Sequence, residues 1–213
     1  STGDEVEALA TSFNSMARAM QRQEDNLAGL IRAYLRFVPE RVLALLGKES
    51  VLDVDKRTFA ARRMSAMMVW FEFPERVYDN STRALFESIN EVIERTAAIV
   101  ARKGGTVFNF AYNGYDVVLD GGEAEAVSTA VAVQQEVLSL NEQRAIDGLP
   151  TVTLRIALDV GEVMIGIVGD ENQMEPATIS SSFTTARHLI GLAGRLEAGI
   201  LCTCLLYTSD AAD

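Results

Sequence analysis

The chain has 213 residues, 48% of them hydrophobic, which is enough for one well-packed core and an appendage. Its 19 Lys and Arg residues stand against 30 Asp and Glu residues, and the formal net charge of -11 is spread along the chain. A basic face that binds nucleic acid is therefore not expected. The apolar runs are far shorter than the roughly 20 residues that span a bilayer, and no signal-peptide pattern is visible at the start, so we expect a soluble chain.

The first forty residues have a helical pattern. Their apolar side chains recur at alternating spacings of three and four, which is typical of a coiled-coil seam. The seam consists of Phe13, Met16, Met20, Gln23, Leu27, Leu30, Tyr34 and Phe37. A parallel two-stranded coiled coil is favoured, because a lone helix packed on its own domain shows a wider apolar stripe; that second interpretation stays open. Pro39 ends the seam or opens a new helix, and Gly47 is predicted to be a helix C-cap.

Alternating strands and helices are predicted from about Arg62. The nearly continuous apolar run "MSAMMVWFEF" suits a central strand covered on both faces. Two helices are expected to face the core with apolar residues at helical spacing. Their core positions are Leu85, Ile89, Val92, Thr96 and Ile99 in the first, and Ala126, Ala130, Val133, Val137 and Leu140 in the second.

A β-hairpin with a type I′ turn at Asn113-Gly114 is predicted between these two helices. The later segment "TVTLRIALDVGEVMIGIVG" is expected to supply two more strands, with Gly161 near the turn between them. The order strand, helix, hairpin, helix, strand predicts an α+β fold, a ferredoxin-like βαββαβ sandwich with an added hairpin.

The C-terminal residues 204–213, "CLLYTSDAAD", resemble one reading frame of a transposase sequencing adapter, and we treat them as an artefact. Cys202 is then the one genuine cysteine. A small buried hydrophobe in a reducing compartment is favoured for it over a zinc or disulfide role.

Residues 1–20 resemble the second helix of a HAMP domain. The matched pattern is Gly-Asp-Glu, then Leu, then Phe-Asn-x-Met, at Gly3, Asp4, Glu5, Leu9, Phe13, Asn14 and Met16. Residues 21–60 then form the coiled-coil signalling helix and linker. In the HAMP family this segment follows a transmembrane helix, so the resemblance implies an upstream membrane-spanning sensor and a place on the cytoplasmic side of the bacterial inner membrane.

Residues 61–203 resemble a C-terminally truncated class III adenylate or guanylate cyclase domain. The resemblance is carried by "GGTVFNF" and "LNEQRAIDGLPTVTLRIALDVGEVMIGIVG". In this family two aspartates hold two metal ions that activate the ribose hydroxyl, and other residues select the base and stabilise the transition state. The resemblance therefore implies a nucleotide site that is shared between two subunits.

Every one of these family positions has a different residue in this chain. The metal aspartates are replaced by Trp70 and Asn113, and the base-selecting residues by Asn109 and Ala177. The transition-state asparagine and arginine are replaced by Thr184 and His188. Glu72 and Asp116 are the candidate substitute metal ligands, although Glu72 is displaced from Trp70 by roughly 6 to 7 Å along its strand.

The sequence thus predicts a dimeric, signal-transducing pseudo-cyclase module that does not make cyclic nucleotide. Its homodimer is expected to form through the coiled coil and the cyclase-domain face, with ATP or GTP as a candidate ligand and no cofactor. The alternative is an active cyclase, with Mg²⁺ or Mn²⁺, that uses a shifted site or a complete partner subunit. Phosphate-binding loops, zinc sites and histidine-based triads have no matching pattern, and the glycines at Gly161, Gly166 and Gly169 belong to strands and not to a dinucleotide-binding turn.

Overall fold

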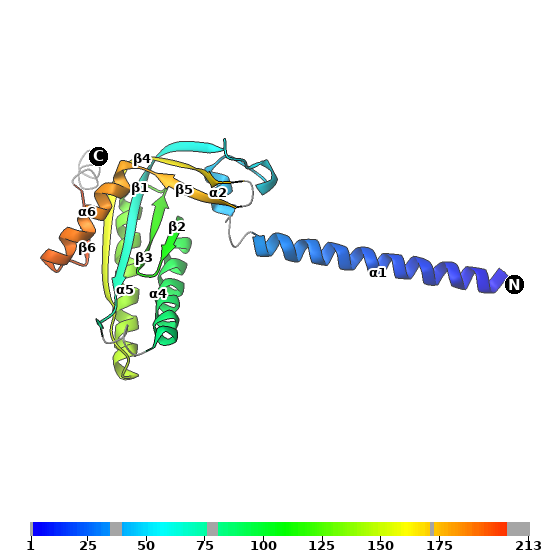
Figure 1. Cartoon of the computed structure of the whole chain (residues 1–213), viewed down its shortest axis with the longest axis horizontal. Coiled ribbons are helices and arrows are strands. Elements are labelled where there is room, and N and C mark those ends of the chain that lie inside the picture. The colour runs from blue at the N-terminus through cyan, green and yellow to red at the C-terminus, as the bar shows by residue number, and fades with distance from the viewer. Residues whose placement is uncertain (1, 35–39, 76–80, 171–172, 204–213) are drawn as a thin grey trace.

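The computed structural model describes residues 2–34, 40–75, 81–170 and 173–203. A long N-terminal helix, α1 (Thr2–Tyr34), extends away from a six-stranded sheet that carries helices on both faces (Figure 1). The α+β class and the helical lead-in are confirmed. Phe37 and Pro39, which the sequence places at the end of the seam, lie outside the described residues, as do 204–213. None of the described helices is long and apolar enough to cross a membrane.

The sheet has the strand order β2-β3-β1-β4-β5, with antiparallel pairing, and β6 pairs in parallel with β4. Two short helical segments precede it, α2 (Glu40–Leu45) and η1 (Val51–Asp53). The remaining elements follow in chain order: β1 (Phe59–Glu72), α4 (Thr82–Arg102), β2 (Gly105–Ala111), β3 (Gly114–Leu119), α5 (Glu123–Ile146), β4 (Thr153–Gly169), β5 (Met174–Ile179), α6 (Ser181–Leu196) and β6 (Ile200–Cys202). This order confirms the βαββαβ sandwich with an added hairpin.

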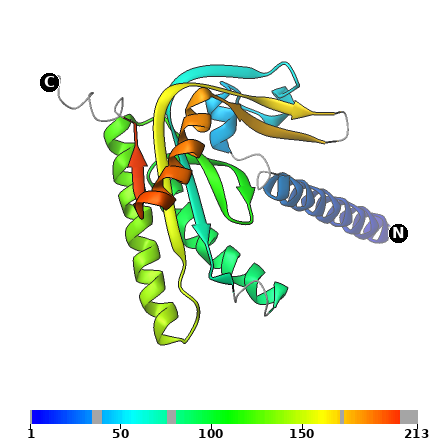
Figure 2. The ribbon, with the colours of Figure 1, turned by 60° about the vertical axis from the view of Figure 1, so that its left-hand side comes forward.

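Strand β1 is the centre of the sheet, as its apolar run predicts. Helices α4 and α5 cover one face of the sheet and α6 lies on the other (Figure 2). Alternate side chains of β1 therefore enter different cores. Val69 and Phe71 pack with α4 and α5, whereas Met68 and Trp70 pack against α6.

The core faces of α4 and α5 agree with the predicted helical spacing. Ile89, Val92, Thr96 and Ile99 are buried in α4, and all five predicted positions are buried in α5. Ser81 caps α4, because its Oγ accepts a hydrogen bond of 3.3 Å from the Ala84 N–H. Gly47 has a φ of 68° directly after α2, which confirms the predicted C-cap.

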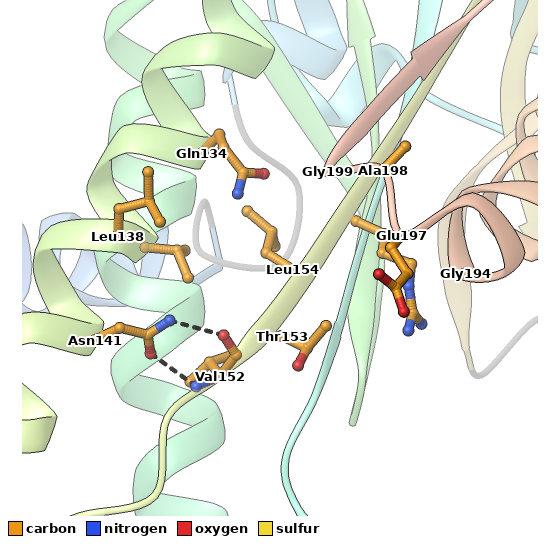
Figure 3. Close-up of a pocket in the computed structure, with 12 residues that line it drawn as sticks. Gln134, Leu138, Asn141, Val152, Thr153, Leu154, Gly194, Glu197, Ala198 and Gly199 are labelled. Atoms are coloured by element: carbon orange, nitrogen blue, oxygen red, sulfur yellow. Dashed lines mark hydrogen bonds between the residues drawn. The ribbon is translucent and has the colours of Figure 1, made fainter.

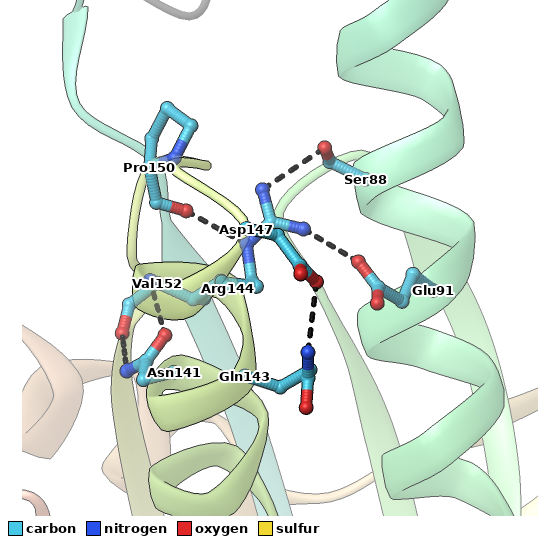
Figure 4. A network of polar contacts seen from close by, with 8 residues as sticks. All are labelled: Ser88, Glu91, Asn141, Gln143, Arg144, Asp147, Pro150 and Val152. Atoms are coloured by element: carbon cyan, nitrogen blue, oxygen red, sulfur yellow. Dashed lines mark hydrogen bonds and ion pairs between the residues drawn. The ribbon is translucent and has the colours of Figure 1, made fainter.

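A buried arginine ties these two helices together (Figure 4). Arg144 in α5 is only 2% exposed, and its guanidinium pairs with Glu91 in α4 at 2.5 Å. It also donates to Ser88 Oγ at 3.2 Å and to the carbonyl oxygen of Pro150 at 2.7 Å, and it lies 5.5 Å from the ring centre of Phe73. The network therefore fixes α4, α5, the start of β4 and the end of β1 relative to one another.

Two predictions about turns are wrong. The segment predicted to form two strands is one continuous strand, β4, and Gly161 lies within it opposite Met64. A Cβ on Gly161 would stand 2.5 Å from Ser182 Oγ, so the glycine permits close approach of α6 and makes no turn. The chain reverses after Gly169, whose φ is 138°.

The β2–β3 connection is not a type I′ turn at Asn113-Gly114. A type I′ turn needs positive φ at both central residues, and neither Asn113 nor Gly114 has it. Tyr112 and Asn113 make the turn, and Gly114 belongs to β3, opposite Trp70. A Cβ on Gly114 would lie 2.1 Å from the Val69 carbonyl oxygen, so glycine is required there by close packing. The left-handed residue is Asn109, with a φ of 49°, at an irregularity in the β2–β3 pairing.

Candidate functional site

A cavity of about 640 Å³ lies between β1, the β2–β3 hairpin and α6. It is large enough for a small organic ligand. Four of the site residues singled out in the sequence line it, and we call it the site cavity. These four are Trp70, Asn109, Asn113 and Asp116.

Asp116 is the carboxyl group of this cavity. It lies opposite Met68 in β1, and it accepts a hydrogen bond of 3.3 Å from Asn109 Nδ2 across the hairpin. Burial raises the pKa of Asp116, and this effect outweighs the hydrogen bond from Asn109 and the positive charge of Arg187, which both lower the pKa. A carboxyl group in this environment accepts a proton or a hydrogen-bond donor more readily than one in water.

Trp70 is held in place by a chain of polar contacts along the sheet. Its indole Nε1 donates to Glu72 Oε1 at 3.1 Å, and Glu72 Oε2 pairs with Arg155 Nη1 at 3.0 Å. The ring is half-buried and packs on the small core between the sheet and α6. Both carboxylate oxygens of Glu72 are thus engaged outside the site cavity, since Glu72 does not line it.

Helix α6 contributes a different set of residues from the predicted one. Thr184 and His188 are exposed and do not line the cavity. Arg187, Ile190 and Gly191 do line it. The spacing of three and four between these residues places them on one helical face, and this is the signal in the sequence that could have identified them.

Comparison with known proteins identifies the fold. No protein-family model matches the sequence. The chain is 24% identical to an adenylate cyclase of Anabaena cylindrica over 95% of its length, but it spans only 42% of that protein. A bacterial light-regulated adenylyl cyclase superposes with a TM-score of 0.75 at 16% identity, over 90% of this chain and 57% of that one.

A third comparison is with a class III adenylyl cyclase-like ATP-binding protein from Pseudomonas aeruginosa. The TM-score is 0.64 at 14% identity, over 76% of this chain and 37% of that chain. The chain has the class III cyclase fold. The resemblance drawn from the sequence is thereby confirmed at the level of the fold. Because α1 has 33 residues and only a tenth of the chain is unmatched in the light-regulated cyclase, part of α1 lies within the matched region.

The residues that the sequence resemblance assigns to the two metal positions do not fit a pair of divalent cations. Trp70 offers an N–H donor and no oxygen, and this donor already binds Glu72. Asn113 is buried and uncharged, whereas Mg²⁺ favours carboxylates. In the part of the chain that the structure describes, no group of three or more His, Cys, Asp and Glu residues could hold a metal ion.

The substitute ligands do not restore the pair. Asp116 lies opposite Met68, and Glu72 lies four residues further along β1, which corresponds to about 13 Å. Two-metal sites hold their ions about 3.5–4 Å apart. Ala177, which the sequence resemblance assigns to a base-selecting position, lies on β5 opposite Gly166 and does not line the site cavity. The cavity can therefore accept a ring and its hydrogen-bond donors, but it lacks the ligands for metal-bound phosphates.

Proposed function

We propose that this chain is a signal-transducing pseudo-cyclase module of a membrane receptor, dimeric and unable to convert ATP or GTP to cyclic nucleotide. The single observation that carries the proposal is the hydrogen bond that holds the indole of Trp70. The sequence resemblance assigns the first metal position to Trp70, and its Nε1 binds a carboxylate that itself pairs with Arg155. Phosphoryl-type chemistry in this fold depends on two metal ions that stabilise developing charge. A tethered indole cannot replace that charge.

The proposed input route runs through α1 and α2. The seam side chains from Phe13 to Leu30 are more than half exposed in the single chain, and a second copy in a parallel coiled coil would bury them. Helix α2 then packs Val42 and Leu45 onto the sheet next to Phe108 and Phe183. A rotation or shift of α1 would therefore reach the core on the α6 side of the sheet.

The receptor setting rests on the sequence resemblance. Residues 1–20 resemble the end of a HAMP domain, so the proposed full-length protein has an upstream membrane-spanning sensor. The described module then lies on the cytoplasmic side of the bacterial inner membrane. The cyclase-domain face is the second proposed contact of the homodimer.

The alternative is an active adenylate or guanylate cyclase. The name of the Anabaena relative favours it, and so does the carboxyl group of Asp116 in the cavity. It would require Mg²⁺ or Mn²⁺ at a shifted site, or a complete partner subunit. ATP or GTP can also be proposed as a ligand without turnover, as the name of the Pseudomonas ATP-binding protein suggests.

Nucleotide binding with and without Mn²⁺ separates these functions. Trp70 is the only tryptophan of the chain and lines the site cavity, so its fluorescence reports occupancy directly. Under our proposal, the affinity for ATP or GTP, where binding occurs, changes less than about twofold on addition of Mn²⁺, since there is no metal pair to bridge the phosphates. A tenfold or larger increase with Mn²⁺ that is lost in Asp116→Ala would support the shifted-site cyclase instead.

A further inference from the structure

A second cavity lies on the other side of β4 and shares no lining residue with the site cavity (Figure 3). It has a volume of about 430 Å³. Helix α5 forms one wall, the turn from α6 to β6 forms the other, and the first residues of β4 form the floor. None of the residues from the sequence-based site lines it.

The floor of this second cavity is a short free edge of the sheet. The Phe71 N–H bonds to the Asn113 carbonyl at 2.8 Å, so the polar backbone of Phe71 faces β3. Leu154, the residue opposite Phe71, therefore directs its own N–H and C=O away from β1. Ile156, two residues on, faces the same way, because its N–H bonds to the Gly199 carbonyl at 2.8 Å.

The residues on either side of Leu154 along this edge, Val152 and Ile156, have hydrogen-bond partners. Asn141 uses its side-chain amide to bind Val152 twice, with Nδ2 to the carbonyl oxygen at 2.8 Å and Oδ1 from the N–H at 2.7 Å (Figure 3). Leu154 lies between them, and within residues 2–34, 40–75, 81–170 and 173–203 its N–H and C=O have no hydrogen-bond partner. Within the same ranges, the buried Oε1 of Gln134, at the cavity wall, also has none.

We propose that the second cavity binds a small ring ligand with a cis-amide edge, that is, an N–H group directly beside a C=O group, as in lactams and cyclic imides. Such an edge forms two hydrogen bonds with one strand residue. Its N–H donates to the C=O of that residue, and its C=O accepts from the N–H of that residue. The chain already contains this pairing, since the carboxamide of Asn141 binds Val152 in the same manner. Within the described residues the N–H and C=O of Leu154 have no protein partner, so a ligand with this edge meets a donor and an acceptor that are both available to it.

The shape of the site selects a compact ring and excludes an added peptide strand. Asn141 closes the edge on one side of Leu154 and Gly199 closes it on the other, so only one residue of the edge is open. A peptide that adds to a sheet needs several consecutive residues. Val137 and Leu138 on α5 and Ala198 across the cavity provide apolar walls for a flat ring.

The test compares two rings, one with N–H donors and one in which methyl groups replace both of these hydrogens. Uracil has three edges at which an N–H stands directly beside a C=O, and 1,3-dimethyluracil has the same ring without an N–H group. Each is titrated into the full ¹⁵N-labelled chain, and the amide resonance of Leu154 is followed. We expect a saturable shift with uracil, with a dissociation constant on the order of 1 mM, the weak range in which such small probes bind. We expect no saturable shift with 1,3-dimethyluracil.

Two variants provide matched controls. A Cβ on Gly199 would lie 3.0 Å from Gln134 Oε1, so Gly199→Val narrows the cavity and should weaken uracil binding at least tenfold. Gly29→Ala, in α1 with no atom within 4 Å of the added Cβ, should leave it unchanged. The proposal is overturned if the Leu154 resonance does not respond to uracil, if both rings shift it equally, or if the shifts centre on Gly114–Asp116. The two-ring comparison needs no variant, so a poorly folded Gly199→Val does not remove the test.

Discussion

Asp116 places a carboxyl group among largely apolar neighbours in the site cavity. Its neighbours across the cavity include Met68 and Ile190, and only Asn109 and the charge of Arg187 oppose the desolvation of its carboxyl group. Because burial raises the pKa of Asp116, the folded state holds the proton more tightly than the unfolded chain does. Ionisation of this group therefore works against folding at neutral pH.

Asp116→Asn should consequently increase the free energy of unfolding at pH 7. The amide keeps the size of the side chain and its acceptor for Asn109, and it removes the buried charge. The gain should shrink as the pH falls and vanish below the ordinary pKa of 3.8, where the carboxyl is protonated in both states. Urea unfolding at fixed protein concentration between pH 3.5 and 7.5 (roughly the range that brackets such a titration) measures it. Asp120→Asn, at an exposed position just after β3, is the control. A gain that is independent of pH would contradict this account.

At the scale of elements, the contact between α4 and α5 depends on an ion pair of which only the arginine is buried. Arg144 is almost fully buried, whereas the side chain of its partner Glu91 is 40% exposed. Removal of the carboxylate leaves a guanidinium without its counter-charge inside the protein. Removal of the arginine leaves a carboxylate that water can reach.

Glu91→Ala should therefore destabilise the protein more than Arg144→Met. We expect a cost of about 3 kcal/mol for Glu91→Ala, the lower end for breaking a buried ion pair, and a smaller cost for Arg144→Met, because methionine fills part of the space without a charge. Thermal and urea unfolding of both variants provide the comparison, with the exposed pair variant Glu87→Ala as a control, for which less than about 1 kcal/mol is expected. The reverse order of the two costs would show that the guanidinium is adequately solvated without Glu91.

Helix α1 provides the element-scale test of the dimer. Leu27→Asp with Leu30→Asp places charges in the exposed seam, and burying unpaired charges against a second copy is unfavourable. The dimer dissociation constant should rise at least about 100-fold, or about 2.8 kcal/mol. Sedimentation equilibrium measures it. Asn14→Asp with Gln21→Asp adds the same charge outside the seam and should leave the dimer intact. A parent chain that is monomeric at tens of micromolar (roughly where weak dimers form) would disprove the coiled coil.

Periodicity made the helices and the central strand predictable, because burial imposes a repeat on one face of each element. The core faces of α4 and α5 and the position of β1 follow from this repeat alone. The glycines were not predictable in the same way. Gly161 and Gly114 are required by a helix and a carbonyl that approach them from distant parts of the chain, and local sequence cannot distinguish this from a turn.

The site was predictable only where it shares a strand or hairpin with the family motif. Trp70, Asn109, Asn113 and Asp116 line one cavity, and their assignment to metal and base positions stays a prediction. Arg187 was missed, because the motif alignment favoured the neighbouring His188, and successive helical residues point about 100° apart. The second cavity could not be predicted from the sequence. Its open edge depends on the hydrogen bonds that Asn141 and Gly199 make to β4 and the residue before it, and these contacts form only in the folded chain.

At the scale of the whole molecule, the chain combines a long helix with an exposed apolar seam, a short helix that packs into the domain, and a class III cyclase fold. Under our proposal, a movement of α1 is passed to the sheet without any chemical step. The Trp70–Glu72–Arg155 contacts also connect the two cavities, because Trp70 lines one and Arg155 lines the other. Such a module would act through its shape and its partners.

Turnover is the measurement that tests this account most directly. Removing one preorganised electrostatic contact commonly slows a reaction about 100 to 1,000-fold, and the sequence resemblance predicts that both metal positions are altered here. The full chain, incubated with ATP or GTP and Mg²⁺ or Mn²⁺, should give no cyclic AMP or cyclic GMP above a control without protein. Trp70→Asp with Asn113→Asp should not restore turnover, because Asn109, Thr184 and His188 still differ from the family residues. Cyclic nucleotide made by the unmodified chain and abolished by Glu72→Ala or Asp116→Ala would contradict the account and place a working metal site at those carboxylates.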